Sequence, residues 1–448
     1  MTSATLGPRL VIAGTHSGVG KTTVATGLMA ALRARGTSVA SAKVGPDFID
    51  PGYHSLATGR PSRNLDAWIC GVEAIAPLAA RAADGASILI VEGVMGLYDG
   101  AVDSTPSSTA DVACLIEAPV ILVVDGSAMS ASVAALVRGY RDHDPQVRLA
   151  GVILNRVSHE RHRQLLVEAL ESIDVQVLGC VGTDDALTWR DRHLGLVPVV
   201  EQPTEVAKQL ARLATVIAES CDLDAVMRVA ASAPRLQAPL PPTAAFVADV
   251  RVAVAGGAAF SFMYRDNIEA LGAAGAEIVS FDPLEDERLP AGIDALVIGG
   301  GFPEVFAPRL GENTELLADV RAHIGNGLVT WAECGGLLWL ARSLDDRPLA
   351  GVLDSRADMT SRLTLGYRTA TARVDNPLFA AGSTVRGHEF HYSTVTPGGD
   401  ALELDSRFAS RAEGFASPTL LATYLHQHLG GDPRPAERLV RAAARNQH

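Results

Sequence analysis

The sequence predicts two consecutive α/β domains, each built around a sheet of parallel strands. In the first domain, β-branched runs at 10–14, 39–45, 87–93, 120–126 and 151–157 alternate with segments of helical periodicity. This alternation is typical of a parallel sheet covered by helices. A proline-rich stretch without helical or strand period follows, and a second alternation begins at residue 251.

These boundaries predict an N-terminal domain over residues 1–231, a Pro- and Ala-rich linker over 232–248 and a C-terminal domain over 249–448. Hydrophobic residues make up 48% and charged residues 20% of the chain. That composition suits two buried cores and excludes a disordered chain. Open α/β sheets bind ligands beyond the carboxyl ends of their strands, so the residues directly after each strand are the candidates for function.

Charge and cysteine content exclude several classes of protein. The net charge of −13 argues against a nucleic-acid partner. The five cysteines are widely spaced and form no C-x-x-C pair, which indicates neither a disulfide framework nor a zinc site. The start of the sequence does not read as a signal peptide, and no run reaches the roughly 18 apolar residues of a membrane span. We therefore expect a cytoplasmic protein without a membrane partner.

A phosphate-binding loop follows the first strand, where residues 14–23 read GTHSGVGKTT. Its glycines let backbone N–H groups turn towards phosphate oxygens, Lys21 supplies a cation, and Thr22 offers a hydroxyl to Mg²⁺. Thr15 stands where the strict motif has its first glycine. The pattern predicts ATP and Mg²⁺ as cofactors. The residues expected to bind the nucleotide here are Gly18, Gly20, Lys21, Thr22 and Thr23.

Polar residues follow three further strands and should surround the same loop. We expect Asp47 and Glu92 to join the P-loop threonine as Mg²⁺ ligands, because Mg²⁺ prefers oxygen donors. Asp50 and Asp99 lie further along their loops and are expected to face the substrate, while Asn155 is placed to present its amide to the nucleotide base. The alternative is that these are solvated, capping or turn-forming side chains, which applies most directly to Asp99 before a glycine.

The C-terminal half contains a cysteine at a strand-turn-helix junction. Cys334 follows an apolar strand and precedes two glycines and a helical segment, as in a nucleophile elbow with cysteine in place of serine. A helix N-terminus favours the thiolate. Backbone N–H groups at Gly300 and Gly335 are candidates for an oxyanion hole, and His426 is the candidate base. The alternative for Cys334 is a buried structural cysteine.

The order of these motifs resembles the cobyrinic acid or hydrogenobyrinic acid a,c-diamide synthases, the glutamine-dependent amidases of corrin biosynthesis. The most specific stretches are KVGPDFIDPGYH and VEGVMGLYDG, followed by GGFPE, WAECGGLLWL, RGHEFHYS and TYLH. The P-loop with threonine at its first glycine position resembles that of dethiobiotin synthetases. The resemblance implies a P-loop NTPase domain followed by a class I glutamine amidotransferase domain.

The resemblance also implies a division of labour. In the second domain, Cys334 would attack the side-chain amide of glutamine, with His426 as its partner, and release ammonia. In the first, MgATP would phosphorylate the a and c carboxylates of the corrin, and ammonia would attack the acyl phosphates. Many amidotransferases have a glutamate two residues after the histidine, but here His428 occupies that position. The orienting third residue stays open, with Glu389 and His388 as candidates.

Three other functions stay open as alternatives. A P-loop switch ATPase of the ParA/MinD type would explain the phosphate loop but needs no cysteine elbow. Cobyric acid synthase and nickel-sirohydrochlorin a,c-diamide synthase share the domain plan. The sequence does not tell whether the macrocycle contains cobalt, nickel or no metal, and it leaves open whether the protein forms a homodimer.

Overall fold

The computed structural model describes residues 3–101, 105–183, 191–192, 195–196, 198–239, 249–406 and 409–446. The chain forms two compact units, Met1–Pro242 and Thr243–His448. Each is an α/β unit, as predicted.

Within the described residues, the main sheet of the first unit has seven strands in the order β4-β3-β5-β2-β6-β7-β8, and every neighbouring pair is parallel. The strands are β2 (Arg9–Gly14), β3 (Val39–Val44), β4 (Arg63–Leu65), β5 (Ile88–Glu92), β6 (Val120–Asp125), β7 (Leu149–Val157) and β8 (Val177–Gly182). The five predicted strands are confirmed, and β4 and β8 extend the sheet at its two edges.

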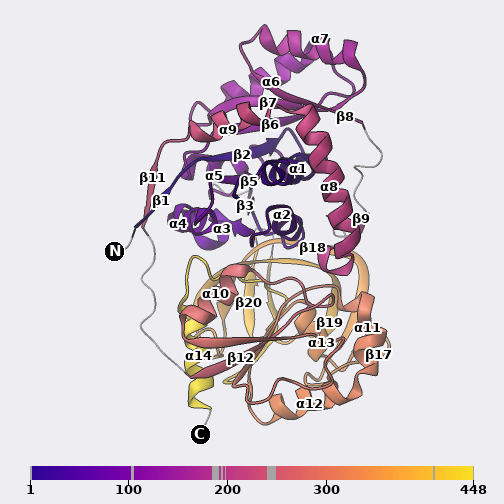
Figure 1. Ribbon diagram of the computed structural model, residues 1–448. Coiled ribbons are helices and arrows are strands. Elements are labelled where there is room, and N and C mark those ends of the chain that lie inside the picture. Colours follow the sequence, from indigo (N-terminus) through magenta and orange to yellow (C-terminus); the bar gives the residue numbers. More distant parts are fainter. Residues whose placement is uncertain are drawn as a thin grey trace. The chain divides into compact units, whose positions relative to one another are not determined.

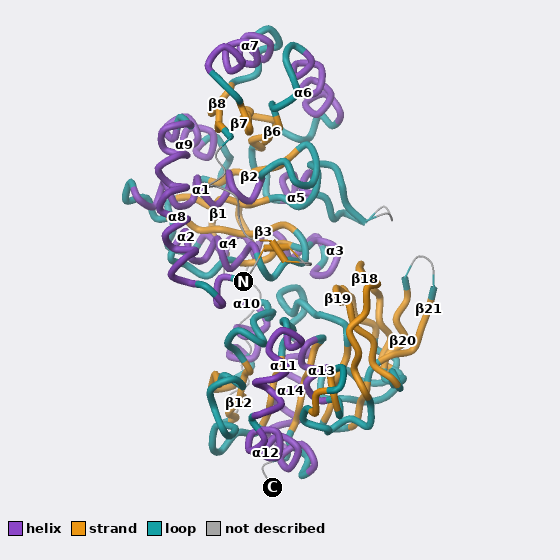
Figure 2. Tube along the Cα trace, turned by 90° about the vertical axis from the view of Figure 1, so that its right-hand side faces the viewer, coloured by secondary structure: helices purple, strands orange, loops and turns teal. Residues whose placement is uncertain are grey.

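Helices cover both faces of this sheet. They are α1 (Lys21–Ala34), α2 (Asp50–Thr58), α3 (Ala67–Cys70), α4 (Val72–Ala83), α5 (Thr109–Leu115), α6 (Ser132–His143), α7 (Glu160–Glu171), α8 (Pro203–Ser220) and α9 (Leu223–Ala231). Short segments complete the unit: β9 (Asp191–Arg192), β10 (Gly195–Leu196) and the 3-10 helix η2 (Val199–Glu201). Helices α1 and α8 lie side by side (Figure 1), and Figure 2 shows α1, α8 and α9 on one side of the sheet with α5 and α6 on the other.

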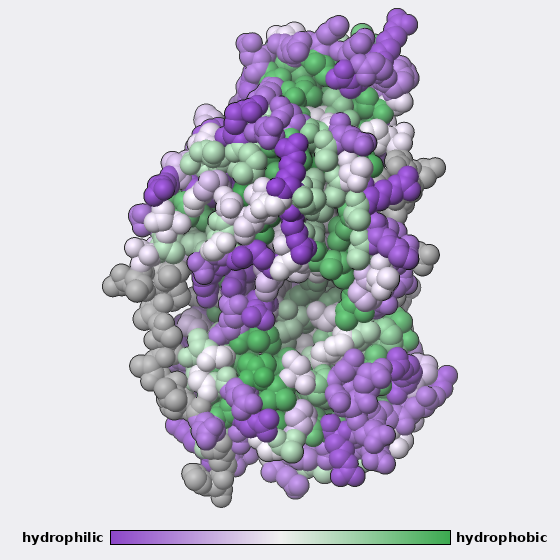
Figure 3. All heavy atoms as spheres, viewed as in Figure 1, coloured by the Kyte–Doolittle hydropathy of each residue, from purple (hydrophilic) through white to green (hydrophobic). Residues whose placement is uncertain are grey.

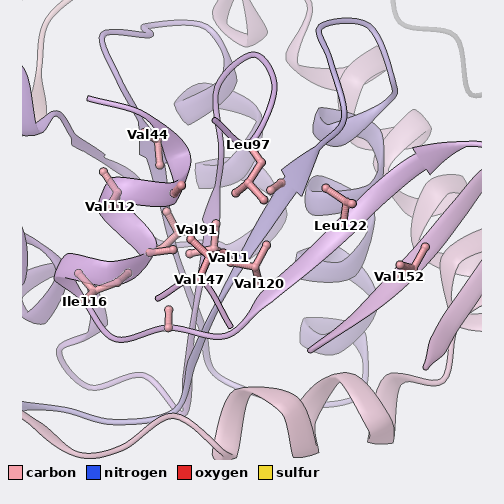
Figure 4. Close-up of a cluster of buried hydrophobic side chains, with 14 of the residues drawn as sticks. Val11, Val44, Val91, Leu97, Val112, Ile116, Val120, Leu122, Val147 and Val152 are labelled. Carbon is pink, nitrogen blue, oxygen red and sulfur yellow. The ribbon is translucent and has the colours of Figure 1, made fainter. Parts of the chain in front are cut away.

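One hydrophobic core of the first unit lies between the sheet and the helices on one of its faces. Val11, Val91 and Leu122 from three central strands pack with Val112 and Ile116 at the end of the α5 segment (Figure 4). All residues of β2, β3 and β5 are buried, which explains why these strands read as continuous apolar runs. The outer helix α7 instead exposes hydrophilic side chains (Figure 3).

The linker prediction is wrong for part of its length. Residues 232–248 are expected to lack regular structure, but β11 (Leu236–Pro239) pairs antiparallel with β1 (Ser3–Leu6) near the start of the chain. The first unit therefore extends beyond residue 231. The reason is that backbone hydrogen bonds to a distant segment stabilise a strand too short to show its own period. Residues 240–248 of the predicted linker lie outside the described residues.

The second unit contains a sheet with the described strand order β13-β12-β14-β15-β23-β22, parallel except for the β22–β23 pair. Its strands are β12 (Val250–Ala255), β13 (Ala276–Phe281), β14 (Ala295–Ile298), β15 (Val329–Glu333), β22 (Phe415–Ser417) and β23 (Leu420–Thr423). Its helices are α10 (Arg265–Ala273), α11 (Pro303–Glu312), α12 (Thr314–Gly325), α13 (Gly335–Leu340) and α14 (Arg434–Arg445).

A further sheet in the second unit is mainly antiparallel and is dominated by the long strands β18 (Arg356–Ala372) and β19 (Thr384–Thr396). Its other strands are β16 (Ser343–Leu344), β17 (Arg347–Pro348), β20 (Leu402–Asp405) and β21 (Ser410–Glu413). Figure 2 shows β18 to β21 together at one side of this unit. Among the described helices of the whole chain, none combines the length and the apolar composition that crossing a bilayer requires.

Candidate functional site

The first candidate site is the P-loop between β2 and α1. Gly18 and Gly20 have positive φ angles of 81° and 98°, which glycine adopts without steric cost. At Gly20 a side chain is also excluded by space, because a Cβ atom would lie 2.2 Å from Nδ2 of Asn155. Lys21, Thr22 and Thr23 then form the first turn of α1, so the loop leads directly into a helix N-terminus.

The end of β7 holds this loop in place. Nδ2 of Asn155 donates a hydrogen bond to the carbonyl of Val19 at 2.9 Å, and the Arg156 guanidinium donates to the carbonyl of Gly18 at 2.8 Å. The sequence predicts that the Asn155 amide faces the nucleotide base. In the structure its N–H group is bound to the P-loop backbone, because Asn155 is among the last residues of β7, which reach the loop. The sequence did not single out Arg156, whose guanidinium also pairs with Asp125 on β6.

Side chains from four elements converge next to Thr22. Its hydroxyl donates to Oε1 of Glu92 at 2.7 Å and lies 3.3 Å from Oδ2 of Asp50. Nζ of Lys43 bridges the same two carboxylates, at 2.7 Å from Asp50 and 2.9 Å from Glu92. Nε2 of His54 contacts the other oxygen of Glu92 at 2.6 Å. We call these five residues the carboxylate cluster.

The structure exchanges the predicted positions of Asp47 and Asp50 relative to Thr22. Asp50, expected to face the substrate, lies in the carboxylate cluster beside Thr22. Asp47, expected at the metal, accepts hydrogen bonds from the backbone N–H groups of Ile49 and Asp50 at 2.8 and 3.0 Å. The reason is the position of α2, which begins at Asp50. Asp47 closes a turn just before the helix, and the first helical turn carries the Asp50 side chain towards Thr22.

Asp99 forms a turn in the loop after β5. Its Oδ2 accepts the backbone N–H of Gly96 at 2.8 Å, which matches the turn-forming alternative considered for this residue. Asp99 also lies within electrostatic range of Lys21, whose pKa it helps to raise. A role for Asp99 towards a substrate stays a prediction.

Burial and charge set the ionisation of the carboxylate cluster. Burial opposes the charged form of Glu92, but Lys43 and His54 outweigh it and hold the Glu92 pKa below its usual value. Burial, Asp47 and Glu92 raise the pKa of Asp50 to about 7 against the opposing effect of Lys43. Burial and the neighbouring Lys43 lower the pKa of Lys21 to about 8. Breaking a buried pair of this kind costs roughly 3–5 kcal/mol, because it leaves a charge uncompensated.

The cluster has the donor chemistry that Mg²⁺ needs. The Thr22 hydroxyl and the Asp50 and Glu92 carboxylates are hard oxygen donors on one side of the P-loop lysine. In the described part of the chain, no group of three or more His, Cys, Asp and Glu side chains surrounds a common point. Mg²⁺ commonly takes one or two protein carboxylates and completes its shell with phosphate oxygens and water, so the Asp50 and Glu92 carboxylates suffice as charged ligands.

The second candidate site is centred on Cys334, between β15 and α13. Cys334 has φ 46° and ψ −99°, a strained conformation for a residue with a side chain, as in a nucleophile elbow. Its backbone N–H donates to the carbonyl of Thr423 on the neighbouring strand β23 at 2.8 Å. His426 follows β23, so parallel pairing of β15 with β23 brings the two residues together. The His426 ring is within hydrogen-bonding reach of the Cys334 sulfur.

The charge of His426 depends on its neighbours. Burial alone lowers its pKa, but Cys334 and Glu333 outweigh burial and raise the pKa to about 10. A protonated His426 can in turn stabilise negative charge on the Cys334 sulfur. The expected pair of nucleophile and base is thus close in space and electrostatically coupled.

Glu333 is the carboxylate that pairs with His426. Its Oε2 lies 3.6 Å from Nδ1 of His426, and its Oε1 accepts the backbone N–H of Gln427 at 3.0 Å. Burial raises the pKa of Glu333, and His426 opposes that shift. The sequence did not single out Glu333; the available signal was a glutamate at the end of an otherwise apolar, fully buried strand.

The two residues considered for this position have other partners. Glu389 binds Arg368 at 2.6 Å and also pairs with Arg411 and His391. Burial raises the Glu389 pKa, but His391 and Arg411 outweigh it and hold the pKa at about 2. His388 stacks on His426 with ring centroids 5.0 Å apart, and burial, His426 and His428 lower its pKa. A neutral imidazole can support the His426 ring but cannot balance its charge.

The oxyanion prediction needs one correction. The Gly300 N–H donates to the carbonyl of Phe262 at 3.0 Å, because these residues form an isolated β-bridge. In the described chain, the N–H groups of Gly301 and Gly335 have no backbone acceptor, and the two residues approach so closely that a Cβ on Gly335 would lie 3.0 Å from the Gly301 nitrogen. Gly335 thus stays a candidate donor, with Gly301 in place of Gly300. Gly300 instead leaves room for His426, whose Cε1 would lie 2.5 Å from a Cβ there.

Comparison with known proteins assigns a family to each unit. Residues 10–197 match the CobQ/CobB/MinD/ParA nucleotide binding domain, and residues 251–434 match the CobB/CobQ-like glutamine amidotransferase domain. The chain is 48% identical to hydrogenobyrinate a,c-diamide synthase of Streptomyces coelicolor, over 98% of this chain and 99% of that protein. It is 43% identical to the Mycobacterium tuberculosis enzyme of that name, over 98% of each chain, and 40% identical to cobyrinate a,c-diamide synthase of Synechococcus, over 95% and 96%.

Proposed function

The chain belongs to the family of hydrogenobyrinate and cobyrinate a,c-diamide synthases, and on this premise we propose that it amidates the a and c carboxylates of hydrogenobyrinic or cobyrinic acid, using ATP, Mg²⁺ and glutamine. It is a glutamine-dependent carbon–nitrogen ligase of cobalamin biosynthesis. The observation that carries the proposal is the combination, in one chain, of a P-loop beside the carboxylate cluster with the coupled pair Cys334 and His426.

The first site addresses the low reactivity of a carboxylate. A carboxylate oxygen of the macrocycle attacks the γ-phosphorus of ATP, ADP leaves, and an acyl phosphate forms. Lys21 at the helix N-terminus offsets the charge that develops on the transferred phosphoryl group. Mg²⁺ held by Thr22, Asp50 and Glu92 would supply further charge neutralisation. Ammonia then attacks the acyl carbon, and phosphate leaves as the amide forms.

The second site supplies the ammonia. The Cys334 thiolate attacks the side-chain carbonyl of glutamine, and backbone N–H groups at Gly301 and Gly335 stabilise the oxyanion. His426 donates its proton to the departing ammonia, leaving a thioester on Cys334. Water then attacks the thioester, with neutral His426 as base, and glutamate leaves.

The identity of the macrocycle is tested by comparing the amidation of three substrates. Purified protein is incubated with ATP, Mg²⁺, glutamine and one of three substrates: hydrogenobyrinic acid, cobyrinic acid or nickel-sirohydrochlorin. We expect a diamide from one of the two corrins and little product from the nickel compound. Faster amidation of nickel-sirohydrochlorin than of both corrins would contradict the proposed substrate class.

Replacing Glu333 with glutamine should impair the glutaminase reaction. Because Glu333 raises the pKa of His426, removing its charge lowers that pKa from about 10, and the imidazolium is lost at a lower pH. We expect the basic limb of the pH profile of kcat/KM for glutamine to move to lower pH. The rate should fall by about 10²-fold, because the general acid–base residue His426 loses the carboxylate that stabilises its protonated form. The profile is measured by glutamate release.

The matched control is Glu277→Gln, which changes an exposed glutamate on β13 and should leave the profile unchanged. Amidation with external ammonia should also be unaffected in Glu333→Gln. A lower rate without any movement of the basic limb would show that Glu333 acts only on packing.

The exchange of Asp47 and Asp50 is tested by a pair of asparagine variants. Asp50→Asn removes a charged oxygen donor beside Thr22, so the Mg²⁺ concentration for half-maximal ammonia-dependent amidation should rise by about tenfold or more. Asp47→Asn keeps a side-chain oxygen for the two backbone N–H groups and should need the same Mg²⁺ concentration as the wild type. The reverse ranking of the two variants would restore the assignment made from the sequence.

A further inference from the structure

Met95 combines two features that are unfavourable for a methionine. It has a positive φ angle of 47° in the loop after β5, a conformation that costs energy for a residue with a side chain. Its side chain is also 41% exposed, although methionine is normally buried. Neither a buried contact nor a relaxed backbone therefore explains a large apolar residue at this position.

The neighbouring residues fix this conformation. The backbone N–H and carbonyl of Val94 both bond to the Thr109 hydroxyl, at 3.0 and 3.1 Å. On the other side, the Gly96 N–H is bound to Asp99 at 2.8 Å and the Leu97 N–H to the Gly14 carbonyl at 2.8 Å. Because hydrogen bonds hold the residues on both sides, the backbone at Met95 is fixed and its side chain stays partly exposed.

The loop lies against the phosphate site. A Cβ on Gly96 would approach the carbonyl of Thr15 in the P-loop to 3.0 Å, and Asp99 acts electrostatically on Lys21. Glu92, three residues before Met95, binds Thr22 in the carboxylate cluster. Met95 therefore exposes an apolar, polarisable side chain from a loop that lies against the P-loop.

We propose that Met95 is a substrate-binding residue that packs against the conjugated face of the macrocycle; this inference rests on the proposed function. A corrin has carboxylates at its rim and a large apolar, conjugated centre. Charged groups of the loops can bind only the rim. A thioether makes favourable contacts with π systems and adapts to irregular shapes, so Met95 supplies the apolar contact that orients the ring while a rim carboxylate is phosphorylated.

The test compares Met95→Gly with Met95→Leu. Glycine removes the contact and relieves the positive φ, whereas leucine keeps the apolar volume. We expect the Kd for hydrogenobyrinic acid, followed by its absorbance without ATP or glutamine, to rise about tenfold in Met95→Gly and less than threefold in Met95→Leu, as loss or retention of one apolar contact predicts. The KM for ATP should not change, and the Tm of Met95→Gly should equal or exceed that of the wild type.

Leu165→Ala, which shortens another exposed apolar side chain in the first unit, is the matched control and should bind the macrocycle like the wild type. Equal macrocycle Kd values for wild type and Met95→Gly would overturn the proposal. A higher KM for ATP alone would assign the contact to the nucleotide, and a lower Tm would assign it to packing; both results overturn it as well. A wild-type protein that binds the macrocycle without amidating it would contradict the proposed function and not the role of Met95.

Discussion

Replacing Cys334 with serine should abolish glutamine-dependent amidation and leave ammonia-dependent amidation close to the wild-type rate. The serine hydroxyl is a far weaker nucleophile than the thiolate that protonated His426 stabilises, so we expect a loss of roughly 10⁴-fold or more in glutamine hydrolysis. The P-loop and the carboxylate cluster belong to the other unit and do not use the thiol. Both rates are measured by chromatography of the amidated macrocycle, with glutamine or ammonium chloride as nitrogen source.

The matched control is Cys114→Ser, which changes a partly buried cysteine of α5 and should retain both activities. Two results would contradict the division into two sites. One is a Cys334→Ser variant that is inactive with ammonia although it folds and binds nucleotide, and the other is a variant that keeps its glutamine-dependent rate.

Replacing Lys21 with alanine should abolish amidation with both nitrogen sources. The lysine begins α1 and lies beside the carboxylate cluster, where it offsets negative charge on the transferred phosphoryl group. Loss of such electrostatic stabilisation is expected to lower the rate roughly 10³-fold. Because carboxylate activation precedes attack by ammonia, an external supply of ammonia cannot rescue this variant. ADP release and amide formation should fall together.

Lys21→Ala should still hydrolyse glutamine in the absence of a macrocycle at the wild-type rate, since Cys334 and His426 are untouched. Together with Cys334→Ser, it separates the two half-reactions. Substantial ammonia-dependent amidation by Lys21→Ala would remove the P-loop from the mechanism.

The sequence predicted the sheet strands well because their signal is local. Strands such as β2 and β5 are buried along their full length, so each reads as a continuous apolar run. The pairing of β11 with β1 was missed because it joins segments at the two ends of the first unit, and neither segment of four residues shows a period of its own. Backbone pairing between distant segments leaves little trace in either one.

Among the candidate residues, too, those with a local sequence signal were predicted and those that depend on distant contacts were not. Lys21, Thr22 and Cys334 were identified because each belongs to a motif whose backbone geometry requires neighbouring glycines. The choice between Asp47 and Asp50 depended on where α2 begins, and a loop of polar residues does not reveal that boundary. Glu333 was missed for another reason: it reaches His426 only because two strands far apart in sequence pair in register.

The most direct test of the account uses glutamine labelled with ¹⁵N in its side-chain amide. Wild-type protein is incubated with the labelled glutamine, ATP, Mg²⁺ and hydrogenobyrinic or cobyrinic acid, and the product is analysed by mass spectrometry while ADP and glutamate are counted. We predict a macrocycle that carries two labelled amides, with one ADP and one glutamate released for each amide formed. ADP release without labelled amide, or labelled amide without ADP, would contradict the coupling of the two sites.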